Sequence, residues 1–246
     1  MKQEYVEGKI KTNIAVAENI YKIAIKGSFT AEPGQFYMLR AWEEEPVLSR
    51  PVSVHNVCDD SIVFLYQAKG RGTELLSRLN KGDSIKLLGP CGNGFHTERL
   101  GGKIAIVGGG IGLAPMLYTA ECLQNCQVDV YAGFRNSPYL IDEFTRAADN
   151  VYIATEDGSE GHKGYVTDIF NPLEYNSVLC CGPQIMMEKV VKMCLSCATP
   201  VWVSMEKHMA CGIGACLVCT CGTKKGVKRT CKDGPVFSGR EVEWDA

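Results

Sequence analysis

The chain has 246 residues, enough for one large domain or two ordinary ones, and its 46% hydrophobic and 22% charged residues are typical of a soluble globular protein. A formal net charge of −2 provides no basic field that would draw the chain to nucleic acid or to an anionic membrane. No apolar run approaches the roughly 20 residues that span a bilayer, and the start MKQEYVEGKI lacks the order of a secretory signal, so we expect a cytoplasmic protein. In such a compartment the 13 cysteines indicate buried thiols and a metal or cluster site rather than disulfides.

The first hundred residues predict an antiparallel β-barrel. Apolar and polar residues alternate over 20–26, 34–40 and 61–67, as in half-buried strands, and Gly, Pro, Asn and Asp separate these segments. A short helix is expected over 73–79, with Thr73 as its N-cap.

After residue 100, predicted strands alternate with predicted helices, which indicates βαβ units and a parallel, Rossmann-like sheet. The expected strands are 103–107, 128–133, 151–154, 178–181 and 201–204. The expected helices are 113–123, 140–148 and 184–193. We therefore predict three parts: a barrel over 1–100, an α/β domain over 101–206, and a small C-terminal segment over 207–246 that is rich in cysteine, glycine and lysine.

A glycine-rich turn stands between the first strand of the α/β domain and the helix that follows it. Gly108, Gly110 and Gly112 lie in this turn, where glycine lets a phosphate approach the backbone and the helix N-terminus offers unpaired N–H groups. Pro115 replaces the third glycine of the dinucleotide motif, and Arg135 rather than an acidic residue follows the second strand. The turn predicts a nucleotide diphosphate site and leaves open NAD, NADP, or a tight turn without a ligand.

Four cysteines of the C-terminal segment have the spacing C-x4-C-x2-C followed by a fourth cysteine after eleven residues. They are Cys211, Cys216, Cys219 and Cys231. The first part of this spacing is that of plant-type [2Fe–2S] proteins, and glycines between the cysteines free backbone N–H groups to point at sulfur. A hairpin over 224–229 would return the fourth ligand, which leaves Cys221 as a spare thiol.

A zinc site is the alternative for the same segment. Cys194 and Cys197 form a second C-x2-C pair, eighteen residues before the pair Cys216 and Cys219. This choice places a predicted strand inside the zinc knuckle and leaves two cysteines of the first set unused, so the iron–sulfur cluster is favoured. His208 is expected to be a packing or loop residue, because four thiolates already complete the ligand set.

The order of these motifs resembles that of the ferredoxin-NADP reductase superfamily. The resemblance rests on Arg50-Pro51-Val52-Ser53, then Gly72-Thr73, the glycine turn, and Cys181-Gly182-Pro183. It implies a flavin-binding barrel and an α/β domain that binds a nicotinamide nucleotide. The residues that it assigns to FAD are Arg50, Pro51, Val52, Ser53, Leu65, Tyr66, Gln67, Gly72 and Thr73.

Within that set, the resemblance places Arg50 and the backbone of Gly72-Thr73 on the FAD pyrophosphate, and Ser53 near the isoalloxazine N5. Cys181, Gly182 and Pro183 would lie beside the nicotinamide. Many members carry an aromatic residue that stacks on the flavin at the position of Val52, so this sequence departs from the family there.

The C-terminal segment narrows the resemblance. Residues 230–237 and 241–244, taken with the cysteine loop, resemble the electron-transfer subunits of dihydroorotate dehydrogenase B. This family implies FAD and a [2Fe–2S] cluster that carry electrons from the FMN of a catalytic dihydroorotate dehydrogenase subunit to NAD⁺ in pyrimidine biosynthesis. It also implies a heterotetramer of two plus two subunits with orotate chemistry on the partner, so no catalytic residue is assigned to this chain.

The combination of sites has its own chemical logic. A nicotinamide moves electrons in pairs, an iron–sulfur cluster moves them singly, and a flavin does both, so the flavin must lie between the other two. Two other functions remain open at this point. One is an NAD(P)H-dependent reductase subunit for ferredoxin or sulfur, and the other is a zinc-stabilised nucleotide-binding module without enzymatic activity.

Overall fold

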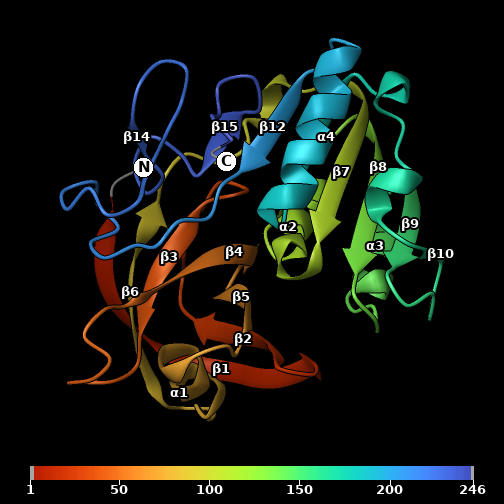
Figure 1. Ribbon diagram of the computed structural model, residues 1–246. Coiled ribbons are helices and arrows are strands. Elements are labelled where there is room, and N and C mark those ends of the chain that lie inside the picture. The colour runs from red at the N-terminus through yellow and green to blue at the C-terminus, as the bar shows by residue number, and fades with distance from the viewer. Residues whose placement is uncertain (1–2, 245–246) are drawn as a thin grey trace.

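Six strands close into an antiparallel barrel in the N-terminal part of the chain (Figure 1). The computed structural model describes residues 3–244, and in it the barrel strands follow the order β1-β2-β5-β4-β3-β6. Their bounds are β1 (Glu4–Ala17), β2 (Ile20–Lys26), β3 (Phe36–Arg40), β4 (Arg50–Cys58), β5 (Ser61–Gln67) and β6 (Ser84–Cys91). The inward residues Ile23, Val54 and Phe64 are fully buried, as the alternating pattern requires. The predicted barrel is confirmed.

The short helix α1 (Arg71–Ser77) lies between β5 and β6, and its start differs from the prediction. Gly70 is the N-cap, and Thr73 is the third helical residue. The Thr73 hydroxyl accepts hydrogen bonds from the backbone N–H groups of Lys69 (3.0 Å) and Gly70 (3.2 Å). Thr73 as N-cap was therefore wrong, because its side chain closes the turn from inside the helix rather than from its edge.

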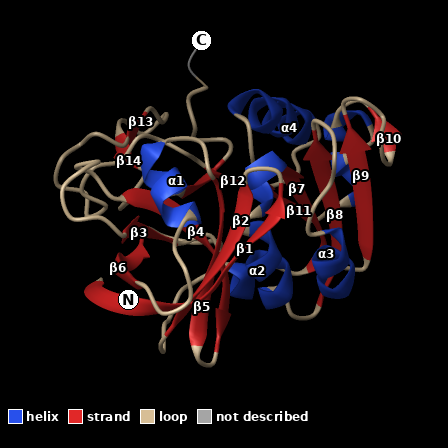
Figure 2. Cartoon of the chain, turned by 90° about the horizontal axis from the view of Figure 1, so that it is seen from below, coloured by secondary structure: helices blue, strands red, loops and turns tan. Residues whose placement is uncertain are grey.

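The second part of the chain forms a seven-stranded sheet with the order β10-β9-β8-β7-β11-β12-β15. Six of its strands are parallel to one another: β7 (Gly102–Gly109), β8 (Cys126–Phe134), β9 (Asn150–Thr155), β10 (His162–Lys163), β11 (Ser177–Cys181) and β12 (Val201–Ser204). The helices are α2 (Met116–Cys122), α3 (Ile141–Ala147) and α4 (Gln184–Ser196), with 3₁₀ turns at η1 (Thr97–Arg99), η2 (Gly110–Leu113), η3 (Val166–Asp168) and η4 (Pro172–Glu174). Helices α2 and α3 cover one face of the sheet and α4 covers the other (Figure 2). The Rossmann-like prediction is confirmed, with helix α2 preceded by the separate turn η2.

The C-terminal segment lies against both parts (Figure 1). Strands β13 (Thr220–Cys221) and β14 (Lys228–Arg229) form the expected hairpin. Strand β15 (Val236–Ser238) then adds to the large sheet, antiparallel to β12. The divisions at 100/101 and 206/207 stay a prediction, and the outer limits 1 and 246 lie outside the described residues.

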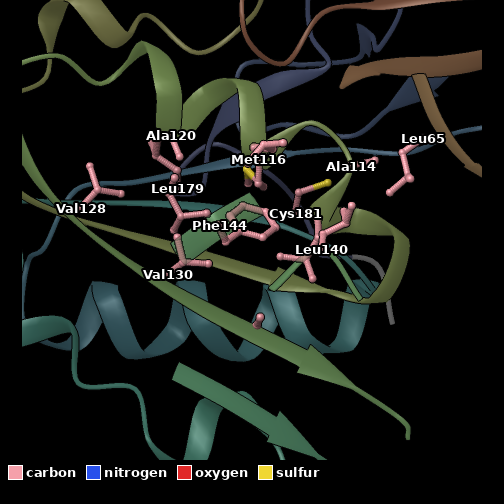
Figure 3. Packing of buried hydrophobic residues seen from close by; sticks show 14 of the residues in the cluster. Leu65, Ala114, Met116, Ala120, Val128, Val130, Leu140, Phe144, Leu179 and Cys181 are labelled. Atoms are coloured by element: carbon pink, nitrogen blue, oxygen red, sulfur yellow. The ribbon is translucent and has the colours of Figure 1, made fainter. Parts of the chain in front are cut away.

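One apolar cluster contains residues of both the barrel and the sheet. Figure 3 shows this cluster between the sheet and helices α2 and α3, with Phe144, Val130 and Leu179 at its centre. Leu65 of barrel strand β5 belongs to the same cluster, close to Ala114 at the start of α2. Burial of this shared surface holds the two parts in one relative position. None of the helices between residues 3 and 244 is both long and apolar enough to cross a membrane.

A buried polar network stabilises the α/β domain at the start of strand β8. Asp129 is fully buried, and its carboxylate accepts hydrogen bonds from the Tyr175 hydroxyl (2.8 Å) and the Asn150 side-chain amide (2.8 Å). It also forms an ion pair with the Lys103 ammonium (3.0 Å). Burial opposes ionisation of Asp129, but these three donors outweigh it and hold the pKa of the carboxyl below its usual value.

We expect Asp129→Asn to lower the melting temperature of the holoprotein by about 4–8 °C, which corresponds to a cost of about 2 kcal/mol. The amide of the Asp129→Asn side chain would direct an N–H group at one of the three donors that now share the Asp129 carboxylate, so two donors would face each other and one hydrogen bond would be lost. Circular dichroism during heating measures the shift, with Glu18→Gln as an exposed control that should leave it unchanged. An Asp129→Asn protein as heat-stable as wild type would show that the network contributes no net stability.

Candidate functional site

A pocket lies between barrel strand β4 and the chain that leaves strand β12. Its lining residues are Phe36, Pro51, Ser53, Ser204, Met205, Glu206, Lys207, Met209 and Pro235. Two of the predicted flavin residues, Pro51 and Ser53, face this pocket. Glu206 lies at the exposed rim of this pocket. The pocket therefore lies between the barrel and the segment that follows the last parallel strand of the sheet.

Arg50 stands at the start of the same strand, against the start of helix α1. Its guanidinium donates to the Leu48 carbonyl (2.7 Å) and lies 5.7 Å from the centre of the Trp42 ring. A Cβ atom added to Gly72 would fall 2.6 Å from Arg50 Nε, so a glycine is needed for this approach. Arg50 and the N–H groups beside Gly72 together fit a pyrophosphate, because a guanidinium fork pairs with phosphate oxygens.

We expect Arg50→Ala to weaken FAD binding by about 10- to 150-fold, because the variant loses charge-assisted hydrogen bonds worth about 1.5–3 kcal/mol. Fluorescence titration of FAD into the flavin-free protein measures this change. Arg99→Ala is the control, because Arg99 is highly exposed and lies in the linker after the barrel. Equal FAD affinity in the Arg50 variant and wild type would remove Arg50 from the site.

Three other predicted flavin residues, Val52, Leu65 and Tyr66, are buried. The side chains of Val52 and Tyr66 pack in the barrel core, and Leu65 packs in the core shared with the sheet. Tyr66 also donates a hydrogen bond to Asn13 (3.2 Å). Any contact of these three residues with a flavin would therefore come from their backbone, while Gln67 is exposed at the end of β5. Their role as flavin contacts stays a prediction.

The glycine turn and the Cys-Gly-Pro triplet meet at the carboxyl ends of neighbouring strands β7 and β11. Gly108 lies beside Cys181 in the parallel register. A Cβ atom on Gly112 would fall 2.4 Å from the Cys181 carbonyl oxygen, and one on Gly109 would fall 2.8 Å from Pro183 Cδ. The two turns thus lie side by side at the edge where α/β sheets bind nucleotides. Together they form a candidate nucleotide site, which we call the nucleotide seat.

Gly110 is the open member of this seat. Its φ is +53°, in the left-handed region that favours glycine, and no atom lies within 4 Å of the place of a Cβ. The backbone there is accessible to a phosphate, so the residues present fit a nicotinamide nucleotide.

The four predicted cluster ligands lie together in the loop before β13 and in the turn after β14. Backbone N–H groups donate to the sulfur atoms of three of them. The bonds run from Gly214 to Cys231 (3.1 Å), from Ala215 and Cys216 to Cys211 (3.3 and 3.4 Å), and from Cys231 to Cys219 (3.4 Å). Burial opposes ionisation of Cys211, yet the N–H groups of Cys216, Ile213 and Ala215 and the neighbouring Cys216 thiol lower the pKa of its thiol to about 6.

The sulfur atoms lie in two neighbouring pairs, one formed by Cys211 and Cys216 and the other by Cys219 and Cys231. Among residues 3–244, no three side chains of metal-ligand type converge on the position of a single ion. Two thiolates for each of two irons is the donor set of a Cys₄ [2Fe–2S] cluster. The donor chemistry of this loop therefore fits the cluster.

The alternative zinc ligands are not brought together with this loop. Cys194 is a buried residue of helix α4, and Cys197 bonds to the Thr199 hydroxyl (3.2 Å) after the end of that helix. Cys219 belongs to a different apolar cluster, next to the barrel. His208 is exposed, and Cys221 is buried beside Val242 rather than among the four sulfur atoms.

The pocket and the cysteine loop share a wall. Phe36 and Met209 line the pocket; Phe36 also belongs to the apolar cluster that contains Cys219 and Cys231, and Met209 packs against that cluster. Gly212 fixes the loop on the barrel, because a Cβ atom there would fall 2.6 Å from Met38 Cγ.

Sequence reasoning missed this wall and the pocket residues after β12. Phe36 is paired with Ser53 across β3 and β4, a register that no local pattern gives. Residues 204–207 follow the carboxyl end of a parallel strand, and the rule that ligands bind at such ends was the available signal.

Comparison with known proteins agrees with these features. A family model described as the iron–sulfur cluster binding domain of dihydroorotate dehydrogenase B matches residues 206–243. The chain is 58% identical over 242 residues to the dihydroorotate dehydrogenase B (NAD(+)) electron transfer subunit of Clostridium acetobutylicum, with 98% of each chain covered. It is 48% identical over 248 residues to the subunit of the same name from Clostridium perfringens, covering 99% of this chain and 100% of that one.

Solved structures show the same fold. A chain of the NADH-dependent reduced ferredoxin-NADP oxidoreductase superposes with a TM-score of 0.86 at 30% identity, covering 97% of this chain and 90% of that chain. The ferredoxin NADP⁺ reductase of Neisseria gonorrhoeae, with bound FAD and NADP, superposes with a TM-score of 0.65 at 19% identity, covering 78% and 91%. The second likeness concerns the fold alone.

The barrel, the parallel sheet and the four-cysteine loop define an oxidoreductase of the ferredoxin-NADP reductase fold with an iron–sulfur cluster binding domain. The chain belongs to the family of electron transfer subunits of dihydroorotate dehydrogenase B.

Proposed function

We propose that this chain is the electron-transfer subunit of an NAD-dependent dihydroorotate dehydrogenase of pyrimidine biosynthesis. It takes electrons from the FMN of a catalytic partner subunit and passes them through a [2Fe–2S] cluster and FAD to NAD⁺. The ligands of the cluster are Cys211, Cys216, Cys219 and Cys231. The complex is a heterotetramer of two plus two subunits in the cytoplasm.

The observation that carries the proposal is the wall shared by the pocket and the cysteine loop. Phe36 and Met209 line the pocket and belong to, or pack against, the apolar cluster of Cys219 and Cys231, so a flavin in the pocket and an iron–sulfur cluster in the loop would be neighbours. Pro51 and Ser53 of strand β4 line the same pocket, and Ser53 is paired with Phe36 across strands β3 and β4. A relay between carriers needs this proximity, whereas a zinc-stabilised binding module does not.

The chain's own residues bind and orient the carriers rather than perform acid–base chemistry. Arg50 and the backbone at Gly72 hold the FAD pyrophosphate, and Ser53 faces the isoalloxazine. Gly112 and Cys181 close the nucleotide seat at the edge of the sheet. When bound, FAD exchanges electron pairs with the nicotinamide and single electrons with the cluster.

The turn after strand β9 favours NAD over NADP. The N–H groups of Glu156 and Asp157 bond to the carbonyl oxygens of Phe134 (3.1 Å) and Arg135 (3.3 Å), so two acidic residues stand beside the end of strand β8. A carboxylate there accepts a hydrogen bond from a ribose 2′-hydroxyl and repels a 2′-phosphate. This supports NAD despite Arg135, which alone left NADP open.

The test is reconstitution with an FMN-containing dihydroorotate dehydrogenase. The purified chain should contain flavin, iron and acid-labile sulfide, and should bind the catalytic subunit. The mixture should reduce NAD⁺ with dihydroorotate, while neither protein alone does so.

The second candidate is a reductase subunit for ferredoxin or sulfur, which the likeness to the NADH-dependent reduced ferredoxin-NADP oxidoreductase favours. Failure of the chain to bind the catalytic subunit, together with NADH-dependent reduction of ferredoxin, would support this candidate instead. A colourless protein that contains zinc would exclude both relays.

A further inference from the structure

His55 is a buried histidine that the relay described above does not use. It lies on strand β4, two residues after Ser53, and is 1% exposed. The register between β4 and β5 shifts between Val54 and Asn56, so His55 is the extra residue of a β-bulge. Bulges re-aim side chains, and this one lets the consecutive residues His55 and Asn56 both face the α/β domain.

The ring of His55 reaches the segment that joins the glycine turn to helix α2. Its Nδ1 lies 2.6 Å from the carbonyl oxygen of Ala114, which stands between η2 and α2. A carbonyl oxygen only accepts hydrogen bonds, so the proton of this bond is on Nδ1. A single short bond thus joins the flavin strand to the nucleotide turn (Ala114 is labelled in Figure 3).

The other ring nitrogen faces helix α3. Nε2 lies 3.7 Å from Oε2 of Glu143 and has no hydrogen-bond partner, although it is buried. Lys22 of barrel strand β2 holds the second oxygen of the same carboxylate at 2.6 Å. The His55 ring and the Lys22 ammonium together lower the pKa of the Glu143 carboxyl to about 2, against its burial. His55, Lys22 and Glu143 therefore form one cluster, through which the barrel contacts helix α3 and, at Ala114, the segment before α2.

We propose that His55 is a positioning residue for NAD⁺, which ties the bulge of flavin strand β4 to the Ala114 carbonyl and so sets the nucleotide seat at its working distance from the flavin. The proposal rests on the proposed function, since it assumes that β4 carries the flavin and that the glycine turn carries the nucleotide.

Two other polar contacts between the barrel and the α/β domain involve helix α2 itself rather than the segment after the glycine turn. Asn56 donates to Glu121 of α2 (2.8 Å) at the exposed rim, and Tyr118 of α2 donates to the Ala31 carbonyl (3.1 Å). These contacts hold the helix to the barrel. His55 alone among the cluster's three side chains touches the backbone that leads directly out of the glycine turn.

The experiment compares His55→Phe, His55→Asn and His55→Gln in the complex with the catalytic subunit. Phenylalanine keeps the ring volume without a donor. The asparagine amide nitrogen takes the place of Nδ1, and the glutamine amide nitrogen takes the place of Nε2. Two rates are measured for each variant: dihydroorotate-dependent reduction of NAD⁺, and dihydroorotate-dependent reduction of ferricyanide, which needs no nicotinamide.

We expect kcat/KM for NAD⁺ to fall by about 10- to 100-fold in His55→Phe and His55→Gln, because a small displacement of a reacting group has effects of this size. His55→Asn should recover most of the loss. FAD content, the cluster spectrum and the ferricyanide rate should stay within about twofold of wild type in all three variants. Asn56→Ala, which removes the exposed contact next to it, should leave the NAD⁺ kinetics within the same limit.

The proposal is overturned if His55→Phe keeps the wild-type kcat/KM for NAD⁺, or if its two rates fall together. It is also overturned if asparagine is no better than glutamine, or if Asn56→Ala has the same effect as His55→Phe. If the wild-type complex does not reduce NAD⁺ with dihydroorotate, the proposed function fails instead. NADH-dependent reduction of ferricyanide by the same variants then still tests His55.

Discussion

Cys216→Ser is expected to yield a protein that contains FAD but no iron. Cys216 stands at the exposed rim of the loop, next to Cys211, and a serine hydroxyl at that place is a poor ligand for iron. The iron content should fall from about two per chain to about zero, with loss of the visible and EPR signals of the cluster. FAD should remain, because none of the four cysteines is among the residues that line the pocket proposed for the flavin.

The kinetic consequence is equally specific. NADH-dependent reduction of ferricyanide should persist in Cys216→Ser, since the flavin and the nucleotide seat are intact. Reduction of NAD⁺ by dihydroorotate through the catalytic subunit should be lost, because the one-electron path is broken.

Cys221→Ser is the matched control. Cys221 lies two residues beyond Cys219, but its buried side chain belongs to the apolar cluster of Val242 and Phe237, whereas Cys219 belongs to a different cluster. This variant should keep both cofactors and both activities. Removal of the iron by Cys221→Ser, or its retention in Cys216→Ser, would show that the ligands are assigned wrongly.

Features set by local sequence could be predicted without the structure. Strands β2 and β5 coincide with the predicted ranges 20–26 and 61–67. Alternation of apolar and polar residues identifies β2, whereas β5, which is buried on both faces, is a short run of β-branched and aromatic residues next to turn residues. The cysteine spacing likewise depends on neighbours in the chain, and it led directly to the loop that the family model covers.

Features that depend on distant residues could not be predicted in the same way. Strand β15 has three residues, too few for any period, and it forms only because β12 offers a free edge. The wall of Phe36 and Met209 joins residues far apart in the sequence, and the bulge at His55 breaks the alternation on which strand prediction relies. The residues that connect the three sites are therefore those that sequence reasoning missed.

Gly112→Ala is expected to lower kcat/KM for NAD⁺ by about 100-fold while leaving FAD and the cluster in place. The added Cβ atom would fall 2.4 Å from the Cys181 carbonyl oxygen and 2.5 Å from Gly182 Cα. Both are backbone atoms, so no change of rotamer relieves the contact, and the glycine turn must separate from the Cys-Gly-Pro turn. Separation opens the seat in which the nicotinamide would face the flavin.

The same two assays locate the defect. Dihydroorotate-dependent reduction of ferricyanide should stay within about twofold of wild type, because that path does not involve the seat. Gly101→Ala is the control, since no atom lies within 4 Å of the place of its Cβ. An unchanged kcat/KM for NAD⁺ in Gly112→Ala would mean that the nucleotide binds normally even though the added methyl group has separated the two turns. The seat formed by the glycine turn and Cys181-Gly182-Pro183 would then not be the nicotinamide site, and the relay would need another exit for its electron pairs.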